Sequence, residues 1–129
     1  MSVTDALDAM RAEVPGCSMV LYADLKSGLV LSASSLGNPG QEALDAQSGA
    51  AQLALEGLLA EGARAVWAET SEAAPEMTWL LTGTDARLFL RSPGAAPEAL
   101  VALCAPDADF DKVADCGRRT LADILALSG

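Results

Sequence analysis

The stretch Gln41–Ala68, QEALDAQSGAAQLALEGLLAEGARAVWA, decides the fold because it predicts one long amphipathic helix. At about 100° per residue, its larger apolar residues gather in one stripe that would face a core. That stripe consists of Leu44, Ala51, Leu55, Leu58, Leu59, Gly62 and Val66. Polar residues, among them Asp45 and Gln52, fall on an adjacent flank that should be solvated. Because Val66 keeps the phase of the stripe, we expect the helix to continue through Gly62.

A second arc of the same helix carries small or apolar residues that a single core does not need. It is made up of Ala46, Ala50, Leu53, Gly57 and Ala60. Small residues at helical spacing let two backbones approach closely, so the arc suits packing against a partner. A glycine such as Gly57 costs about 1 kcal/mol relative to alanine inside a helix, which argues for a packing reason. The other interpretation is that alanine is simply a good helix former, and the pattern alone leaves both open.

Trp67 and Trp79 are the two tryptophans of the chain. Core packing is the default interpretation for both. Tryptophan is also enriched at the energetic centres of protein interfaces. Trp67 projects toward the second arc of the helix, so it is the better candidate for a partner contact, and Trp79 is the other.

Composition and charge narrow the function. The 129 residues suit one domain spanning 1–129, and the 51% hydrophobic content supports a core. A formal charge of −10 speaks against nucleic acid and against an anionic membrane surface, but allows a basic protein partner. No apolar run is long enough to span a bilayer and no signal pattern begins the chain, so we expect a cytoplasmic protein without membrane insertion.

The inventory of catalytic and metal-binding residues is poor. The chain has no histidine, and its three cysteines, Cys17, Cys104 and Cys116, are widely spaced, which favours buried free thiols. We therefore expect no catalytic residues, no metal site and no cofactor. The DxDxD run at 107–111 lacks the glycine and glutamate of a calcium loop, and helix capping explains it better. Arg87 and Arg91 could grip a carboxylate, although local pairing or solvation is commoner.

The pattern of apolar residues and turns predicts helix, two strands, long helix, three strands, helix. The first helix is capped by Ser2 or Thr4 and ended by Pro15-Gly16, and the last runs from about Phe110 to Leu127. The strands are Ser18–Leu25, Leu29–Ser35, Met77–Thr82, Ala86–Arg91 and Glu98–Ala105, with a connector at Ser71–Glu76. Tight connections require mostly antiparallel pairing. The expected class is α+β, a five-stranded antiparallel sheet with helices on its faces.

The order of these elements, with the residues at their joints, resembles the roadblock/dynein light chain family. The resemblance rests on Val14-Pro15-Gly16, the hairpin Leu25-Lys26-Ser27-Gly28-Leu29-Val30, the long alanine- and leucine-rich helix, the strand end Arg87–Pro93, and Leu103–Asp109 before the last helix. It covers nearly the whole chain, and its specificity lies in the order of weak motifs. The long connector and Cys104 in the last joint depart from the family pattern.

This resemblance implies a profilin-like sandwich, with the long helix on one face and the two terminal helices on the other. It also implies homo- or heterodimers that pair long helices and the edges of the third strands, and a non-enzymatic role as a platform for small Ras-like GTPases or in motor and signalling complexes. The alternative function is a small-molecule sensor, since profilin-like and PAS-like sandwiches share this layout. A ligand-sized cavity between the sheet and the long helix would favour the sensor.

Overall fold

The computed structural model describes residues 2–37, 39–55, 76–93 and 97–128. The helices and strands within these residues follow the expected order. They are α1 (Val3–Glu13), β1 (Cys17–Asp24), β2 (Val30–Ser35), α2 (Gln41–Leu55), β3 (Met77–Leu81), β4 (Ala86–Arg91), β5 (Glu98–Cys104) and α4 (Phe110–Ser128). The predicted strand bounds agree with these to within one residue. The expected continuation of α2 to about Ala68, and the connector at 71–75, lie outside the described residues.

The five strands form one antiparallel sheet in the order β2-β1-β5-β4-β3. Two hairpins, β1–β2 and β3–β4, lie on either side of β5, which pairs with both β1 and β4. Within this sheet β2 and β3 are therefore the edge strands. The α+β class and the antiparallel sheet expected from the sequence are confirmed.

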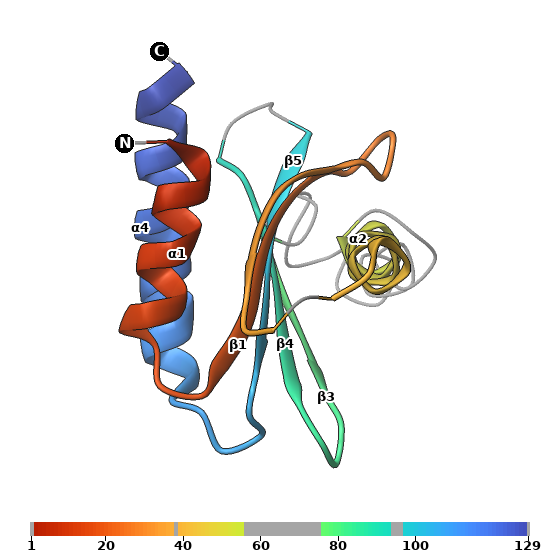
Figure 1. The fold of residues 1–129 in the computed structure, drawn as a ribbon, viewed down its shortest axis with the longest axis vertical. Helices are drawn as coiled ribbons and strands as arrows, with labels where there is room; N and C mark the ends of the chain where they lie inside the picture. Colours follow the sequence, from red (N-terminus) through yellow and green to blue (C-terminus); the bar gives the residue numbers. More distant parts are fainter. Residues whose placement is uncertain (1, 38, 56–75, 94–96, 129) are drawn as a thin grey trace, which may run out of the picture.

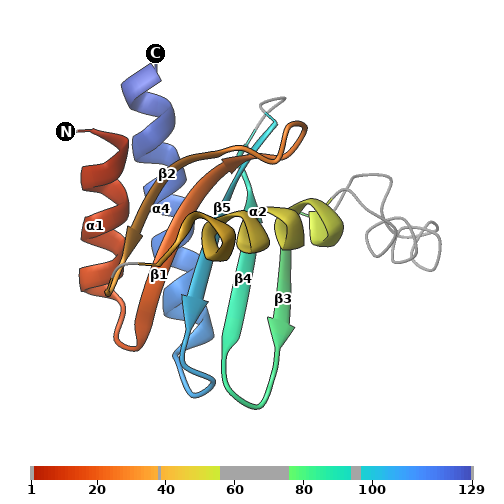
Figure 2. The same cartoon turned by 45° about the vertical axis from the view of Figure 1, so that its right-hand side comes forward.

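The helices cover both faces of the sheet. Figure 1 shows α1 and α4 side by side on one face and α2 on the other. In Figure 2, α2 crosses the sheet in front of the strands, with its last described turn beside β3. The layered arrangement implied by the family resemblance is thus confirmed, and α2 crosses the sheet from the β1–β2 side to the edge strand β3.

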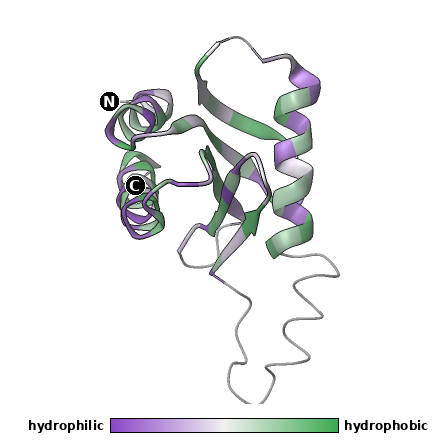
Figure 3. Cartoon of the chain, turned by 90° about the horizontal axis from the view of Figure 1, so that it is seen from below, coloured by the Kyte–Doolittle hydropathy of each residue, from purple (hydrophilic) through white to green (hydrophobic). Residues whose placement is uncertain are grey.

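Each face of the sheet has its own apolar core. Strand alternation divides β4 between them, since Leu88 and Leu90 join the core under α1 and α4 while Phe89 joins the core under α2. The core under α2 also contains Leu21, Ala51 and Leu55 with several neighbours, which confirms the described part of the expected stripe. Figure 3, seen from below, shows the layers edge on, with α2 separated from the two terminal helices by the sheet.

Polar contacts stabilise both ends of α1 and bind its C-terminal end to α4. Ser2 and Asp5 form a capping box at the start of α1. At the other end, the Glu13 carboxylate accepts hydrogen bonds from the Cys116 thiol and the Arg119 guanidinium of α4, both at 3.1 Å. These two donors hold the pKa of Glu13 below its usual value. The pKa of Cys116 rises to about 11, because burial and the Glu13 carboxylate both disfavour its thiolate.

Candidate functional site

Two polar side chains fix the orientation of α2 about its own axis on the sheet. The Ser48 hydroxyl, which is buried, donates to the Gly28 carbonyl oxygen at 2.7 Å. The Gln52 side chain donates to the Leu25 carbonyl oxygen at 2.9 Å. The expectation that Gln52 is solvated was wrong, because its half-buried amide donates to a turn carbonyl. These bonds to the β1–β2 turn determine which arc of α2 faces outward.

This anchoring predicts that Gly28→Ala is more destabilising than Gly37→Ala. Both glycines have positive φ, +76° and +78°, so both substitutions cost about 1–2 kcal/mol of backbone strain. A Cβ at Gly28 would also lie 3.0 Å from the Gln52 amide oxygen, whereas a Cβ at Gly37 meets nothing within 4 Å. Displacing the Gln52 hydrogen bond adds about 1 kcal/mol at Gly28 alone. Urea unfolding of the two variants measures the difference, and equal costs would contradict this account of how α2 is held.

Two arginines on β4 make contacts within the chain. The Arg91 guanidinium donates to the Leu55 carbonyl oxygen at 2.7 Å, which secures the last described turn of α2 against β4. The Arg87 guanidinium lies 3.2 Å from the Asp85 carboxylate, which confirms local pairing there. The Arg91 contact positions α2 relative to β4, and the Arg87 contact lies within the β3–β4 hairpin.

The aspartate run at 107–111 caps a helix. The Asp109 carboxylate accepts a hydrogen bond from the Lys112 backbone N–H at 3.2 Å, at the start of α4, which confirms the capping interpretation. Among the residues that the structure describes, no three His, Cys, Asp or Glu side chains come together in a way that could hold a metal ion. None of the helices in the described ranges is both long and apolar enough to cross a lipid bilayer.

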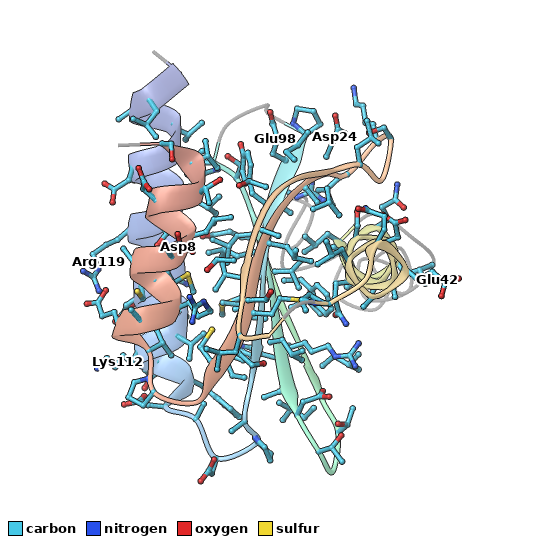
Figure 4. All side chains as sticks on the ribbon, viewed as in Figure 1. Asp8, Asp24, Glu42, Glu98, Lys112 and Arg119 are labelled. Carbon is cyan, nitrogen blue, oxygen red and sulfur yellow. The ribbon has the colours of Figure 1, made fainter. Side chains whose placement is uncertain are left out.

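The outward arc of α2 meets β3 across a shallow apolar groove of about 200 Å³. The groove is lined by Ala50 and Leu53 from α2, by Leu80 from β3 and by the buried Phe89 beneath them. Leu53 is 57% exposed and Leu80 is 44% exposed. Glu42, at the start of α2, lies on the side of the helix away from the sheet (Figure 4). Two exposed leucines beside one groove form a surface that would gain from burial against a partner.

The groove continues onto an edge strand. In the described sheet β3 pairs with β4 only, from Met77↔Leu90 to Leu81↔Ala86, so its other edge has backbone groups free to pair with another strand. Leu81, just before the β3–β4 turn, is 57% exposed, but alternation puts it on the same face of β3 as Trp79. We call the surface formed by Ala50, Leu53, Leu80 and the outer edge of β3 the α2–β3 surface.

The structure brings together only some of the contact residues predicted from the sequence. Ala46 and Leu53 are exposed on the outward side of α2, whereas Ala50 is half-buried and packs against the edge of the core under α2. The predicted contacts Gly57, Ala60 and Trp67 lie outside the described residues, so their part in the surface stays a prediction.

Trp79 borders the groove from β3, but its ring lies on the other face of the sheet. There it stacks on Phe110 of α4, with ring centroids 4.6 Å apart. The default core interpretation of Trp79 is therefore the better one for its ring. Strand alternation explains this, since neighbouring positions on β3 face opposite sides of the sheet.

Sequence reasoning missed Leu80 as a surface residue. The same alternation that puts Trp79 under α4 puts Leu80 on the α2 side, at a strand edge that α2 covers incompletely. The run Trp79-Leu80-Leu81 could have indicated this surface. It places apolar side chains on both faces of the strand, whereas one apolar face is enough to contribute to a core.

Solved structures show which fold this is. The sequence matches no protein-family model, and no curated protein matches it. The Roadblock/LC7 domain from Streptomyces avermitilis is similar in structure, with a TM-score of 0.77 at 12% identity over 98% of each chain. This chain has the roadblock fold. The resemblance seen at the joints of the sequence is confirmed at the level of the fold.

Two further structural relatives are Mgl proteins of two other bacteria. The gliding protein MglB from Thermus thermophilus is similar with a TM-score of 0.72 at 20% identity, over 95% of this chain and 84% of that chain. MglC from Myxococcus xanthus is similar with a TM-score of 0.61 at 16% identity, over 98% of each chain. Identities this low establish the shared roadblock fold and nothing finer.

Proposed function

We propose that residues 1–129 form a single roadblock-like domain that acts as a dimeric, non-enzymatic scaffold for a small Ras-like GTPase. The observation that supports the dimer is the α2–β3 surface, which places exposed leucines beside an edge of β3 that pairs with no strand among the described residues. A second copy, or a related subunit, related by a twofold axis would cover the leucines and extend the sheet at the same time. The predicted contacts Ala46, Gly57, Ala60 and Trp67 would lie in or beside this interface.

The GTPase partner rests on the roadblock fold and on the family resemblance of the sequence. The net charge of −10 supports a partner with a basic surface, and such a pair associates faster at low salt. Because small Ras-like GTPases act inside the cell, the proposal places the chain in the cytoplasm. It involves no nucleic acid, no cofactor and no insertion into a membrane.

The test is a titration of the purified chain with a small Ras-like GTPase encoded beside it, loaded with GDP or with a non-hydrolysable GTP analogue. We expect binding in the micromolar range that differs between the two nucleotide states and weakens with added salt. Calorimetry gives the Kd, and hydrolysis and exchange rates show whether the scaffold also regulates. An unrelated Ras-like GTPase is the matched control. No binding, together with unchanged hydrolysis and exchange for every co-encoded GTPase, would overturn the proposal.

The described part of the structure does not favour the sensor alternative. Between α2 and the sheet, Leu21, Leu55 and Phe89 are each at most 1% exposed, so side chains fill this space. The groove beside them, at about 200 Å³, is smaller than the roughly 300–1,000 Å³ of usual small-molecule sites. An apolar groove of this size at a strand edge suits a protein partner better.

A further inference from the structure

Two of the three cysteines lie opposite each other on adjacent strands. In the pairing of β1 with β5, Cys17 is the direct partner of Cys104. A β-bulge makes this possible, because the register shifts between Cys17 and Met19 and leaves Ser18 as the extra residue. Without it, simple alternation would turn Cys17 toward the α2 face along with Met19. With it, Cys17 shares the α1–α4 core with Cys104.

The backbone hydrogen bonds show what kind of pair this is. The Ala105 N–H donates to the Gly16 carbonyl oxygen at 2.9 Å, and the Cys17 N–H donates to Val14 rather than across the sheet. Cys17 and Cys104 are therefore a non-hydrogen-bonded antiparallel pair. Such pairs bring Cα atoms to about 4.5 Å and side chains closer than hydrogen-bonded pairs do. That separation lies within the roughly 4.4–6.8 Å that a disulfide spans.

We propose that Cys17 and Cys104 form a built-in oxidation site, in which a small hydroperoxide converts the two thiols into a cross-strand disulfide. The Cys17 thiolate attacks one peroxide oxygen, the O–O bond breaks, and the leaving oxygen departs with the electron pair and takes up a proton, as water from hydrogen peroxide or as an alcohol from an alkyl hydroperoxide. Cys104 then attacks the resulting sulfenic acid, the S–S bond forms, and the second oxygen leaves as water with the Cys104 proton. The two thiols lose two electrons and the peroxide gains them. This inference goes beyond the scaffold role and does not depend on it.

Both steps have a structural basis. The Cys17 thiol donates to the Met19 carbonyl oxygen at 3.6 Å, and the neighbouring Cys104 thiol lowers the pKa of Cys17, whereas Cys17 and burial raise the pKa of Cys104. Cys17 is thus the expected attacking sulfur, and the direct pairing of the two residues places Cys104 opposite the residue whose sulfur it must attack. Zinc in proteins takes four ligands, at least three of them from side chains. No group of three or more His, Cys, Asp or Glu side chains that could hold a metal ion occurs among the described residues, so the two thiols do not form a zinc site.

The cysteine pair lies close to the surface, next to two chain joints that line a pocket. Cys17 is 4% exposed and Cys104 is 2% exposed, so the thiols lie just under the surface and not at it. Directly next to them in the chain are the α1–β1 and β5–α4 joints. A pocket of about 460 Å³ opens between these joints, lined by residues 14–16 of the first joint, residues 107–109 of the second and Lys112 of α4. Figure 4 shows Lys112 at this end of the molecule. The disulfide would link the two joints and so fix where α1 and α4 meet the sheet.

The experiment treats the native full chain with hydrogen peroxide and maps the products by intact mass and peptide mass spectrometry. We expect the loss of two hydrogens, a single Cys17–Cys104 peptide cross-link and one remaining free thiol, Cys116. The oxidised protein should show a Tm higher by about 5 °C or more, reversed by dithiothreitol. Oxidised glutathione, which is too bulky for buried thiols, should react at least tenfold more slowly.

Three variants sharpen the test. Cys116→Ser should give the same cross-link at the same rate, while Cys17→Ser and Cys104→Ser should give none and no shift in Tm. If either of these variants fails to fold, the wild-type peptide map decides alone. Three intact thiols after prolonged peroxide, a cross-link that includes Cys116 or a second chain, or cross-linking only in denaturant would each overturn the proposal.

Discussion

Leu53→Glu converts the proposed dimer into a folded monomer, with a Kd for dimerisation raised by about a thousandfold. Burying a leucine that is exposed in the free chain contributes about 2 kcal/mol, and a twofold axis places two copies of Leu53 in one interface. The loss of both contributions, about 4 kcal/mol, corresponds to about three powers of ten in Kd. Because Leu53 is 57% exposed in the chain itself, the substitution leaves the core under α2 intact. Light scattering coupled to size exclusion measures the mass at several concentrations.

Leu127→Glu is the matched control for this prediction. Leu127 is 44% exposed and lies near the end of α4, on the opposite face of the sheet from the α2–β3 surface. It carries the same chemical change without touching the proposed interface, so the dimer should persist. Leu80→Glu, at an equal 44% exposure but on β3, should dissociate the dimer as Leu53→Glu does. A dimer that survives both Leu53→Glu and Leu80→Glu would contradict the assignment of this surface.

The sequence predicts the outward arc of α2 well because helical periodicity is local. The positions of Leu44, Ala51 and Leu55 determine which side of the helix is buried, and Ala50 and Leu53 then follow by angle alone. Sequence reasoning failed on Gln52, since it treated a polar residue on a flank as solvated. Its partner is a carbonyl in a turn far away in sequence, and helical periodicity contains no information about such contacts.

The same limit applies to the cysteine pair. The spacing of Cys17 and Cys104 suggested separate buried thiols, and the structure confirms that both are buried and free. Cys17 and Cys104 lie opposite each other because the strand order places β5 beside β1 and because a one-residue bulge occurs at Ser18. A one-residue change of register moves a side chain to the other face of the sheet, so the pattern of a single strand cannot reveal such a pair.

Phe89→Ala has the largest expected effect on stability, a loss of about 3–5 kcal/mol in the free energy of unfolding. Phe89 is 1% exposed, lies on the central part of β4 and faces α2, where it also forms the floor of the groove. Truncation leaves a cavity bounded by a sheet that cannot collapse, because β4 is hydrogen-bonded to strands on both sides. Such a loss is a large part of the roughly 5–15 kcal/mol that stabilises a domain.

The other phenylalanine of the chain supplies the comparison. Phe110, at the start of α4, is only partly buried and stacks on Trp79, so Phe110→Ala removes the same atoms from a site that solvent can fill. We expect it to cost less than half as much as Phe89→Ala in urea unfolding followed by circular dichroism. If Phe89→Ala does not fold, Phe89→Leu, with a smaller cavity, should still cost more than Phe110→Leu. Equal costs at the two positions would mean that α2 does not seal the sheet, and a loose α2 could not present Leu53 in a fixed position to a partner.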